Sequence, residues 1–363
     1  MIRRIAMAVG DTAGHVLPAI AVAEAFAARF DDSEVHFFAA GAGTGHWLVE
    51  QAGFTLDRVT GSPIARVDRL AQMAALGRAA AGAVQARKLL ARHRVRLVIG
   101  TGGYGSAGAL VAARTLGLKT ALIEPNVEPG LANRVLARIV HRAYVACPEA
   151  AAALPAVRSV VSGLPVRRAM AQSVAGRHRP EWPKLKLLVT SGSRGEQFLG
   201  ICVPPFVLEL KKAGMQVEVR HQGGTRAAEI QQHYERLGIE ASTEPFIDDM
   251  GCALAWADFV VARAGAGTSA ELALAGVPSL LVPLSDAAND HQAINAKAIA
   301  ARGAALWIRE EDWDTAVLAQ RVIAIVRDGQ AWQSMARAIT ALAMPDAADQ
   351  IVRDCETLME GHW

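Results

Sequence analysis

The chain has 363 residues, of which 52% are hydrophobic and 20% are charged, and its formal net charge at pH 7 is +3. This length exceeds what one hydrophobic core usually holds, so we expect two domains, and the composition excludes long disordered stretches. No apolar run reaches the length of a transmembrane helix, and the apolar run near the N-terminus is too short for a signal peptide. The four cysteines are isolated and have no metal-binding spacing, so we expect reduced thiols, a cytosolic protein and no metal site.

The first half of the chain alternates apolar, strand-like runs with helical patterns. We expect strands near residues 4–9, 34–39, 96–100, 119–124 and 143–147. We expect helices near residues 15–29, 46–52, 69–92, 107–116 and 130–139. This βα alternation predicts a parallel sheet that is covered by helices on both faces.

The same pattern begins again in the second half, at residues 184–192. Further strands are expected near 216–220, 258–262 and 279–283, and helices near 196–213, 225–237, 268–275 and 290–302. We therefore expect an α/β protein with two Rossmann-like, doubly wound parallel-sheet domains and a ligand cleft at the carboxyl ends of their strands.

The domain limits follow from composition. Residues 1–160 form the expected first domain, 161–183 a linker rich in Gly, Pro and Arg, and 184–342 the second domain. Residues 343–363 contain a C-terminal helix. Periodicity does not decide which domain this helix packs on, and packing back on the first domain is one option.

Positive charge is concentrated in residues 61–100, which hold eight Lys or Arg residues and one acid, Asp68. The stretch from Arg66 to Arg96 also carries apolar residues at helical spacing. One interpretation is the solvated face of an ordinary helix, and the other is a surface that rests on anionic lipid headgroups.

Four glycine-bearing turns each lie between an expected strand and an expected helix. They read GDTAGH (10–15), GTGGYGS (100–106), TSGSRGE (190–196) and ARAGAGTSAE (262–271). A strand that turns into a helix presents backbone N–H groups to an anion such as a phosphate. None of the four fits the NTPase P-loop pattern, and none makes a good dinucleotide fingerprint.

The turn at residues 262–271 carries further polar residues. Thr268 and Ser269 lie where we expect a helix N-cap, beside N–H groups that a diphosphate could accept. Glu271 lies in the expected first turn, where a carboxylate can accept both hydroxyls of a ribose. The alternative is that Ser269 is only a cap and Glu271 only an acid that matches the helix dipole.

The segment from 257 to 284 resembles the nucleotide-sugar signature of the MurG family. This family comprises the UDP-N-acetylglucosamine–N-acetylmuramyl-(pentapeptide) pyrophosphoryl-undecaprenol N-acetylglucosaminyltransferases, within glycosyltransferase family 28. The resemblance covers nearly the whole chain in register. It rests on the motifs GDTAGHVLPAIAVAEAF, GTGGYGSAGALVAARTLGLKTALIEPN, GLANRVLA, GLPVR, SGSRG, EPFIDDM, AWADFVVARAGAGTSAELALAGVPSLLVP and DHQAINA. It implies a GT-B architecture with the donor bound mainly by the second domain and the lipid acceptor mainly by the first.

The resemblance also implies site residues. Glu271 matches the ribose-binding acid, Ile247 the residue whose backbone contacts uracil, and Gln292 the glutamine near the GlcNAc hydroxyls. The set implied for UDP-sugar binding is Thr12, Ala13, Gly14, Asn126, Arg167, Ser193, Ile247, Ala266, Gly267, Thr268, Ser269, Ala270, Glu271 and Gln292. The set implied for acceptor binding is Gly10, Asp11, Gly102, Gly103, Tyr104 and Glu124.

The acceptor side departs from the family pattern. In the opening loop, GGTGGH in the family, Asp11 and Ala13 replace glycines. The family's HEQN reads IEPN here, with Ile123 and Pro125, and its GNPVR reads GLPVR, with Leu164. A carboxylate beside a pyrophosphate is repelled, so these departures put the usual acceptor in doubt.

Three roles for Asp11 stay open. It could repel the acceptor pyrophosphate, help His15 to take the acceptor proton, or point away and cap the following helix.

In an inverting sugar transfer, the acceptor hydroxyl loses a proton while the UDP diphosphate leaves. His15 is the best candidate for the catalytic base, because its pKa range suits neutral pH and it opens a helix. It could instead bind the acceptor pyrophosphate, and Glu124 and Asp11 are weaker candidates for the base. Helix N-termini, rather than a metal or another cofactor, are expected to stabilise the leaving group.

Three functions follow from this reading. The first is transfer of N-acetylglucosamine to undecaprenyl-pyrophosphoryl-MurNAc-pentapeptide (lipid I to lipid II) in peptidoglycan synthesis, by a cytoplasmic protein peripheral on the inner membrane face. The second is transfer from a UDP-sugar to another lipid or a secondary metabolite. The third is an inactive nucleotide-sugar-binding protein that acts in assembly. The expected partners are UDP-GlcNAc, a polyprenyl-pyrophosphate-linked acceptor, an anionic membrane surface and cell-wall synthesis proteins, with no nucleic acid.

Overall fold

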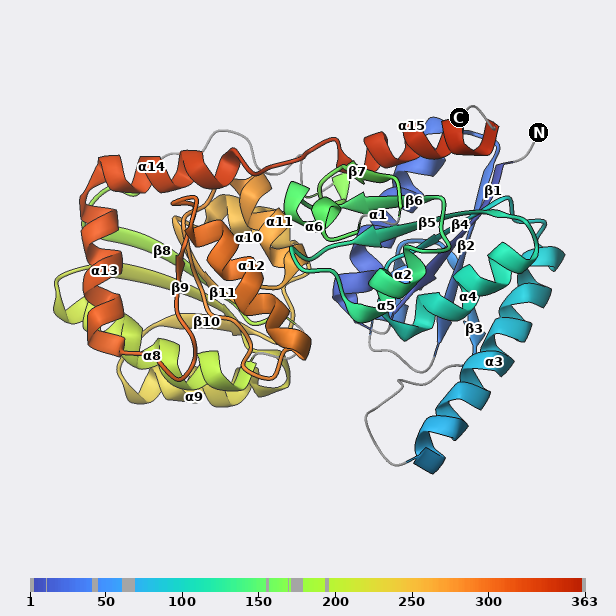
Figure 1. The fold of residues 1–363 in the computed structure, drawn as a ribbon. Coiled ribbons are helices and arrows are strands. Elements are labelled where there is room, and N and C mark those ends of the chain that lie inside the picture. The colour runs from blue at the N-terminus through green and yellow to red at the C-terminus, as the bar shows by residue number, and fades with distance from the viewer. Residues whose placement is uncertain are drawn as a thin grey trace. The chain divides into compact units, whose positions relative to one another are not determined.

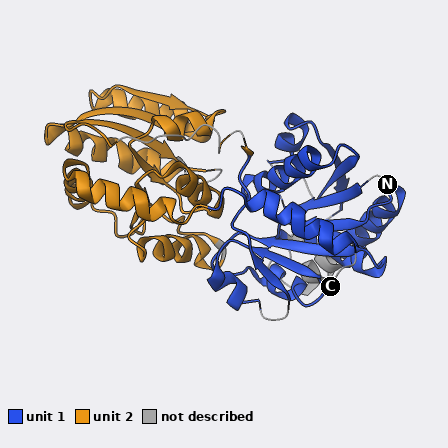
Figure 2. Cartoon of the chain, turned by 90° about the horizontal axis from the view of Figure 1, so that it is seen from above, with its two compact units in different colours: residues 1–167, 344–363 blue, residues 168–343 orange. Residues whose placement is uncertain are grey.

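The chain divides into two compact units, Met1–Arg167 with Met344–Trp363 and Arg168–Ala343 (Figure 2). A computed structural model describes residues 3–10, 12–40, 45–60, 69–154, 157–168, 170, 179–192 and 196–360. Within these ranges, the side chains of residues 69–76, 104, 196 and 288 are not described. Asp11, Ser193 and the segment 61–68 lie outside the described residues.

Within the described residues, unit 1 contains a seven-stranded sheet with the order β3-β2-β1-β4-β5-β6-β7, and every pairing in it is parallel (Figure 1). Its strands are β1 (Arg3–Val9), β2 (Ser33–Ala40), β3 (Thr55–Val59), β4 (Leu97–Gly100), β5 (Lys119–Glu124), β6 (Arg142–Val145) and β7 (Ser159–Val161). Alternate residues of a strand face opposite sides of the sheet, so both faces can be apolar.

The helices of unit 1 cover both faces of this sheet. They are α1 (Ala13–Arg29), α2 (His46–Gln51), α3 (Arg69–Arg92), α4 (Gly103–Thr115), α5 (Leu131–Leu136), α6 (Pro148–Ala152) and α15 (Ala347–Glu360). On one face, Phe38 of β2 shares a buried core with Leu90 of α3 and Leu110 of α4. Helices α1 and α15 pack against each other.

The C-terminal helix α15 is attached to unit 1 by buried polar contacts. Asp354 accepts hydrogen bonds from Tyr144 Oη at 2.9 Å and from Arg142 Nε at 3.2 Å, and the Arg142 side chain is 3% exposed. Burial raises the pKa of the Cys355 thiol, which lies 3.1 Å from the Tyr144 hydroxyl, to about 12. Although α15 follows all of unit 2 in the sequence, these contacts attach it to the sheet of unit 1.

Unit 2 contains, in its described part, a six-stranded parallel sheet with the order β10-β9-β8-β11-β12-β13. Its strands are β8 (Lys184–Thr190), β9 (Gln216–Gln222), β10 (Ala241–Glu244), β11 (Phe259–Ala262), β12 (Ser279–Leu281) and β13 (Leu306–Trp307). Its helices are α8 (Glu196–Lys212), α9 (Ala227–Arg236), α10 (Met250–Trp256), α11 (Ala266–Ala275), α12 (His291–Ala300), α13 (Thr315–Arg327) and α14 (Gly329–Thr340).

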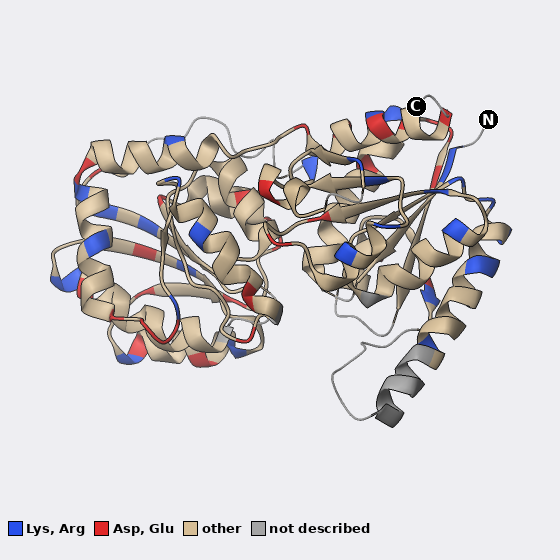
Figure 3. Ribbon diagram, viewed as in Figure 1, with Lys and Arg blue, Asp and Glu red and all other residues tan. Residues whose placement is uncertain are grey.

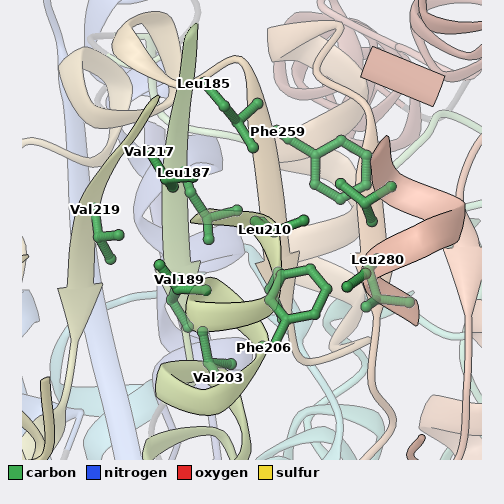
Figure 4. Close-up of a cluster of buried hydrophobic side chains, with 14 of the residues drawn as sticks. Leu185, Leu187, Val189, Val203, Phe206, Leu210, Val217, Val219, Phe259 and Leu280 are labelled. Carbon is green, nitrogen blue, oxygen red and sulfur yellow. The ribbon is translucent and has the colours of Figure 1, made fainter. Parts of the chain in front are cut away.

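The main core of unit 2 lies between the sheet and helix α8. Figure 4 shows Leu187 and Val189 of β8 beside Val203, Phe206 and Leu210 of α8. All five side chains are fully buried. Because burial of one such side chain contributes about 1.5–3 kcal/mol, this cluster fixes how α8 lies on the sheet.

The expected α/β class with two parallel sheets is confirmed. The pattern did not predict four short strands, β3, β7, β10 and β13. None of the helices in the described ranges combines the length and the apolarity that are needed to cross a lipid bilayer.

Candidate functional site

The four glycine-bearing turns lie at the two topological switch points of the sheets. In unit 1 the strand order reverses between β1 and β4, which lead into the turns at 10–15 and 100–106. In unit 2 it reverses between β8 and β11, which lead into the turns at 190–196 and 262–271. Ligands of open α/β sheets bind at such points, so each unit has two of the predicted turns at its own switch point.

His15 lies against the glycines of both turns in unit 1. A Cβ added at Gly10 would lie 2.7 Å from His15 Nδ1, and one added at Gly103 would lie 3.7 Å from His15 Cε1. The imidazole therefore occupies space that only a glycine at position 10 leaves open. Thr12 Oγ1 lies 3.1 Å from His15 Nδ1 and orients the ring by a hydrogen bond.

Helix α1 begins at Ala13, earlier than the expected start near His15, and its N-cap is Thr12 in an extended conformation. Ala13 and Gly14 thus belong to the first turn, where backbone N–H groups have no acceptor within the helix. The predicted roles of Asp11 concern a residue outside the described ranges and stay predictions.

The turn between β4 and α4 depends on left-handed glycines. Gly102 has φ +91° and Gly103 has φ +72°, a region that residues with a side chain rarely adopt. Ser106 Oγ donates to the carbonyl oxygens of Gly102 and Gly103 at 3.0 and 3.1 Å, which fixes the turn from within α4. The backbone of Tyr104 lies in the first turn of α4.

Glu124 is an anchor for the loop after β5. Its carboxylate is 1% exposed and accepts hydrogen bonds from Asn126 N and Nδ2, Gly130 N and Asn133 Nδ2, at 2.8–3.2 Å. Burial raises the pKa of Glu124, although these hydrogen bonds to the charged form oppose the shift. Both carboxylate oxygens are committed to the protein, so the predicted contact with an acceptor stays a prediction.

In unit 2, helix α11 begins earlier than the sequence predicted. Its N-cap is Gly265, and Ser269 lies inside the helix, where its N–H donates to the Gly265 carbonyl at 2.9 Å. The expectation of an N-cap at Thr268 or Ser269 is therefore wrong, and Glu271 lies in the second turn rather than the first. Gly265 caps the helix without a side chain, so the sequence signal of a Ser or Thr cap is absent here.

The first turn of α11 nevertheless presents a site for an anion. The N–H groups of Ala266, Gly267 and Thr268 have no acceptor within the helix, and the helix dipole adds positive potential there. Ser269 Oγ is a buried atom without a hydrogen-bond partner in the structure. Glu271 is half-buried one turn further on.

The turn that precedes α11 is held by a buried ion pair whose two residues lie far apart in the sequence. Arg263 Nη1 lies 2.6 Å from Glu310 Oε1, and the two side chains are 5% and 17% exposed. Arg263 also donates to the carbonyls of Val282 and Pro283, at 3.2 and 3.3 Å. Burial lowers the pKa of Arg263, while Glu310 opposes that shift.

The other predicted donor residues of unit 2 lie on neighbouring loops. Ile247 is buried in the loop between β10 and α10, and α10 packs against α11. Gln292 lies in the first turn of α12, and its Oε1 accepts from Leu284 N at 3.0 Å, so this oxygen is committed to the loop after β12. Arg167 lies in unit 1, in the segment that follows β7.

Two aspartates of unit 2 cap helices. Asp249 Oδ1 accepts from Cys252 N at 2.8 Å at the start of α10. Asp314 closes an Asp-x-Asp triplet with Asp312 and accepts from the first N–H groups of α13.

Both halves of the chain match models of one protein family. Residues 5–145 match the glycosyltransferase family 28 N-terminal domain, and residues 186–351 match the family's C-terminal domain. The chain is similar to the UDP-N-acetylglucosamine–N-acetylmuramyl-(pentapeptide) pyrophosphoryl-undecaprenol N-acetylglucosamine transferase of Magnetococcus marinus. The two are 36% identical over 355 residues, which is 96% of each chain.

Two solved structures resemble the fold. The crystal structure of MurG from Acinetobacter baumannii has a TM-score of 0.77 at 27% identity, over 98% of this chain and 99% of that one. The calicheamicin glycosyltransferase structure has a TM-score of 0.68 at 15% identity, over 99% of both chains, a likeness of fold alone. These similarities confirm the GT-B class that the sequence resemblance implied.

Proposed function

Because the chain belongs to glycosyltransferase family 28 and is a glycosyltransferase, we propose that it transfers N-acetylglucosamine from UDP-GlcNAc to undecaprenyl-pyrophosphoryl-MurNAc-pentapeptide. The observation that carries this proposal is the full-length similarity to enzymes that bear this name. We place the protein in the cytoplasm, peripheral on the inner face of the membrane where that acceptor is presented.

Donor binding is assigned to unit 2. The N-terminus of α11 meets the diphosphate, Glu271 accepts from the ribose hydroxyls, and the loop at Ile247 meets the uracil. As the bond to the sugar breaks, negative charge grows on the diphosphate, and N–H groups already fixed at a helix N-terminus stabilise it.

Acceptor binding and proton removal are assigned to unit 1. His15, oriented by Thr12, takes the proton of the attacking hydroxyl, and the turn at Gly102 and Gly103 admits the acceptor close to the backbone. The inverting displacement forms the new glycosidic bond on the opposite face of the sugar while UDP departs.

A different acceptor is the second candidate, because acceptor-side residues depart from the family pattern. Ile123 and Leu164 are buried, 1% and 6% exposed, so these two departures alter packing rather than a surface that a substrate could touch. This favours the peptidoglycan acceptor over another lipid or metabolite.

Two experiments test the proposed reaction. Purified protein should convert lipid I to lipid II with labelled UDP-GlcNAc, and the gene should restore growth to cells depleted of their own peptidoglycan enzyme. Transfer to a different lipid together with failed complementation would favour the second candidate. Binding of UDP-GlcNAc without any transfer would favour the assembly role.

We expect Glu271→Ala to weaken UDP binding by about 2–3 kcal/mol, or roughly 30- to 150-fold, because charge-assisted hydrogen bonds to the ribose are lost. Calorimetric titration with UDP measures this loss. Glu240→Ala, which changes an exposed acid of the same unit, is the matched control. Wild-type affinity in Glu271→Ala would remove the assignment.

We expect the basic segment from Arg66 to Arg96 to bind anionic membranes. Its described basic side chains on and after α3 are all exposed; they are Arg78, Arg87, Lys88, Arg92, Arg94 and Arg96. Figure 3 shows Lys and Arg positions in blue along the described part of α3. Vesicles with anionic lipid should sediment the protein, neutral vesicles should not, and binding should weaken as salt rises.

A double variant tests the segment directly. Lys88→Gln with Arg92→Gln should weaken vesicle binding by about 2 kcal/mol, or roughly 30-fold, since each charge contributes about 1 kcal/mol. Lys211→Gln with Lys212→Gln, at the end of α8, is the control. Equal partition to both vesicle types, or to neither, would support the solvated-face interpretation instead.

A further inference from the structure

Three potential metal ligands gather on unit 1, from elements far apart in the sequence. His36 comes from β2, Asp57 from the neighbouring strand β3, and His93 from the turn that follows α3 (Figure 1). Their ligand atoms all lie within 4.8 Å of one another. Because Asp57 pairs in register with Phe38, two residues after His36, all three side chains meet on the face that α3 covers.

One imidazole nitrogen of each histidine lacks the hydrogen bond that a buried polar atom usually makes. His36 Nε2 and His93 Nε2 are both buried atoms without a hydrogen-bond partner. His93 Nε2 lies 3.0 Å from Asp57 Oδ2 but is not aligned as a hydrogen bond. A bound cation is one of the few explanations for unpartnered polar atoms beside a carboxylate.

The two imidazole rings lie stacked beside the carboxylate. Their centroids are 4.1 Å apart at an interplanar angle of 28°, so the side chains of β2 and of the turn after α3 are packed directly against each other. This packing holds one ligand atom from each ring close to an Asp57 carboxylate oxygen, within the 4.8 Å that a single ion can bridge.

We propose that His36, Asp57 and His93 bind one divalent transition-metal ion, and that Zn²⁺ suits the site best. Two imidazoles and a carboxylate are ligands that zinc accepts, and a water molecule can complete four-coordination because the side chains are 16%, 33% and 24% exposed. Glu34 Oε2, paired with Arg4, lies 4.0 Å from His36 Nε2 and adds negative charge nearby.

The site is structural and does not depend on the proposed function. His36 lies in the first half of β2, and His93 shortly precedes β4, so the group lies away from the carboxyl ends that carry the glycine turns. A bound ion would link the edge strand β3, its neighbour β2 and the end of α3. It would therefore stabilise unit 1 without touching the substrates.

The test is a calorimetric titration of the tag-free, full-length protein with Zn²⁺, and with Co²⁺ as a spectroscopic probe. We expect saturable binding of one ion, a rise in Tm with Zn²⁺, and a tetrahedral Co²⁺ spectrum. Asp57→Asn and His93→Gln should each weaken binding on the order of 100-fold, and should remove the rise in Tm. His233→Gln, on α9 of unit 2, is the matched control and should bind as wild type does.

Asp57→Asn keeps the size and shape of the side chain, so it decides the question if His93→Gln does not fold. Absence of saturable Zn²⁺ binding by the wild type would overturn the proposal. Equal binding by wild type, Asp57→Asn and a folded His93→Gln would also overturn it, because the ion would then bind elsewhere. Because the site lies away from the glycine turns, we expect Zn²⁺ to leave the rate of sugar transfer unchanged.

Discussion

Replacing His15 by alanine is expected to lower kcat by about 10²- to 10⁴-fold, the usual contribution of a positioned general base. The imidazole lies at the start of α1, within hydrogen-bond distance of Thr12 Oγ1 and directly against Gly10. Among the other described residues of this turn, none carries an imidazole or a carboxylate. Steady-state kinetics with lipid I and UDP-GlcNAc, each varied separately, measure the effect.

The division between kcat and KM separates the two roles that the sequence left open for His15. A base acts in the transition state, so its loss lowers kcat and leaves UDP affinity unchanged. If His15 binds the acceptor pyrophosphate instead, the KM for lipid I should rise while kcat changes little. His233→Ala removes an imidazole far along the chain, in unit 2, and should change neither constant.

The parts of the site that the sequence predicted are those that depend on local chemistry. Strand, glycine turn and helix follow one another within a few residues, so the four turns could be read from composition and periodicity. The switch-point topology then placed these turns in pairs. The strands β3, β7, β10 and β13 were not predicted from the sequence. They lie at the edges of the sheets and have only two to five residues, so they show little apolar periodicity.

The predicted start of α11, at Thr268 or Ser269, differs from the observed start at Ala266 for another reason. Ser, Thr and Asp caps give a sequence signal, whereas a glycine cap resembles any turn, so Gly265 was not recognised. Thr268 and Ser269, predicted as cap residues, therefore lie inside the helix. The N–H groups expected to meet a diphosphate still lie at this helix end.

Side-chain contacts between residues far apart in the chain could not be predicted from the sequence. Arg263 follows β11 and Glu310 follows β13, two strands along in the same sheet, and their side chains form an ion pair. His36 and His93 meet because α3 returns the chain to the sheet. Neither pair has a spacing that a local pattern could recognise. Asp354 likewise reaches Arg142 only after unit 2 has been completed, so periodicity could not assign α15 to a unit.

The Arg263–Glu310 ion pair yields the largest expected effect on stability. Glu310→Ala should lower the free energy of unfolding of unit 2 by about 3–5 kcal/mol, because the Arg263 guanidinium would stay buried without its counter-charge. The two carbonyl acceptors of Arg263 cannot replace that charge. Since Arg263 directly precedes the turn into α11, UDP affinity should fall as well, even in the folded fraction.

Urea unfolding, followed with and without UDP, measures both consequences. Glu311→Ala is the matched control, because Glu311 is the next residue and its exposed side chain only approaches Arg309 at 4.0 Å, a contact that contributes about 0–1 kcal/mol. Glu310→Gln should lie between the two, since an amide can still accept from Arg263 but carries no charge. If Glu310→Ala costs no more than Glu311→Ala, water reaches the guanidinium and Arg263 is not the anchor of the donor turn.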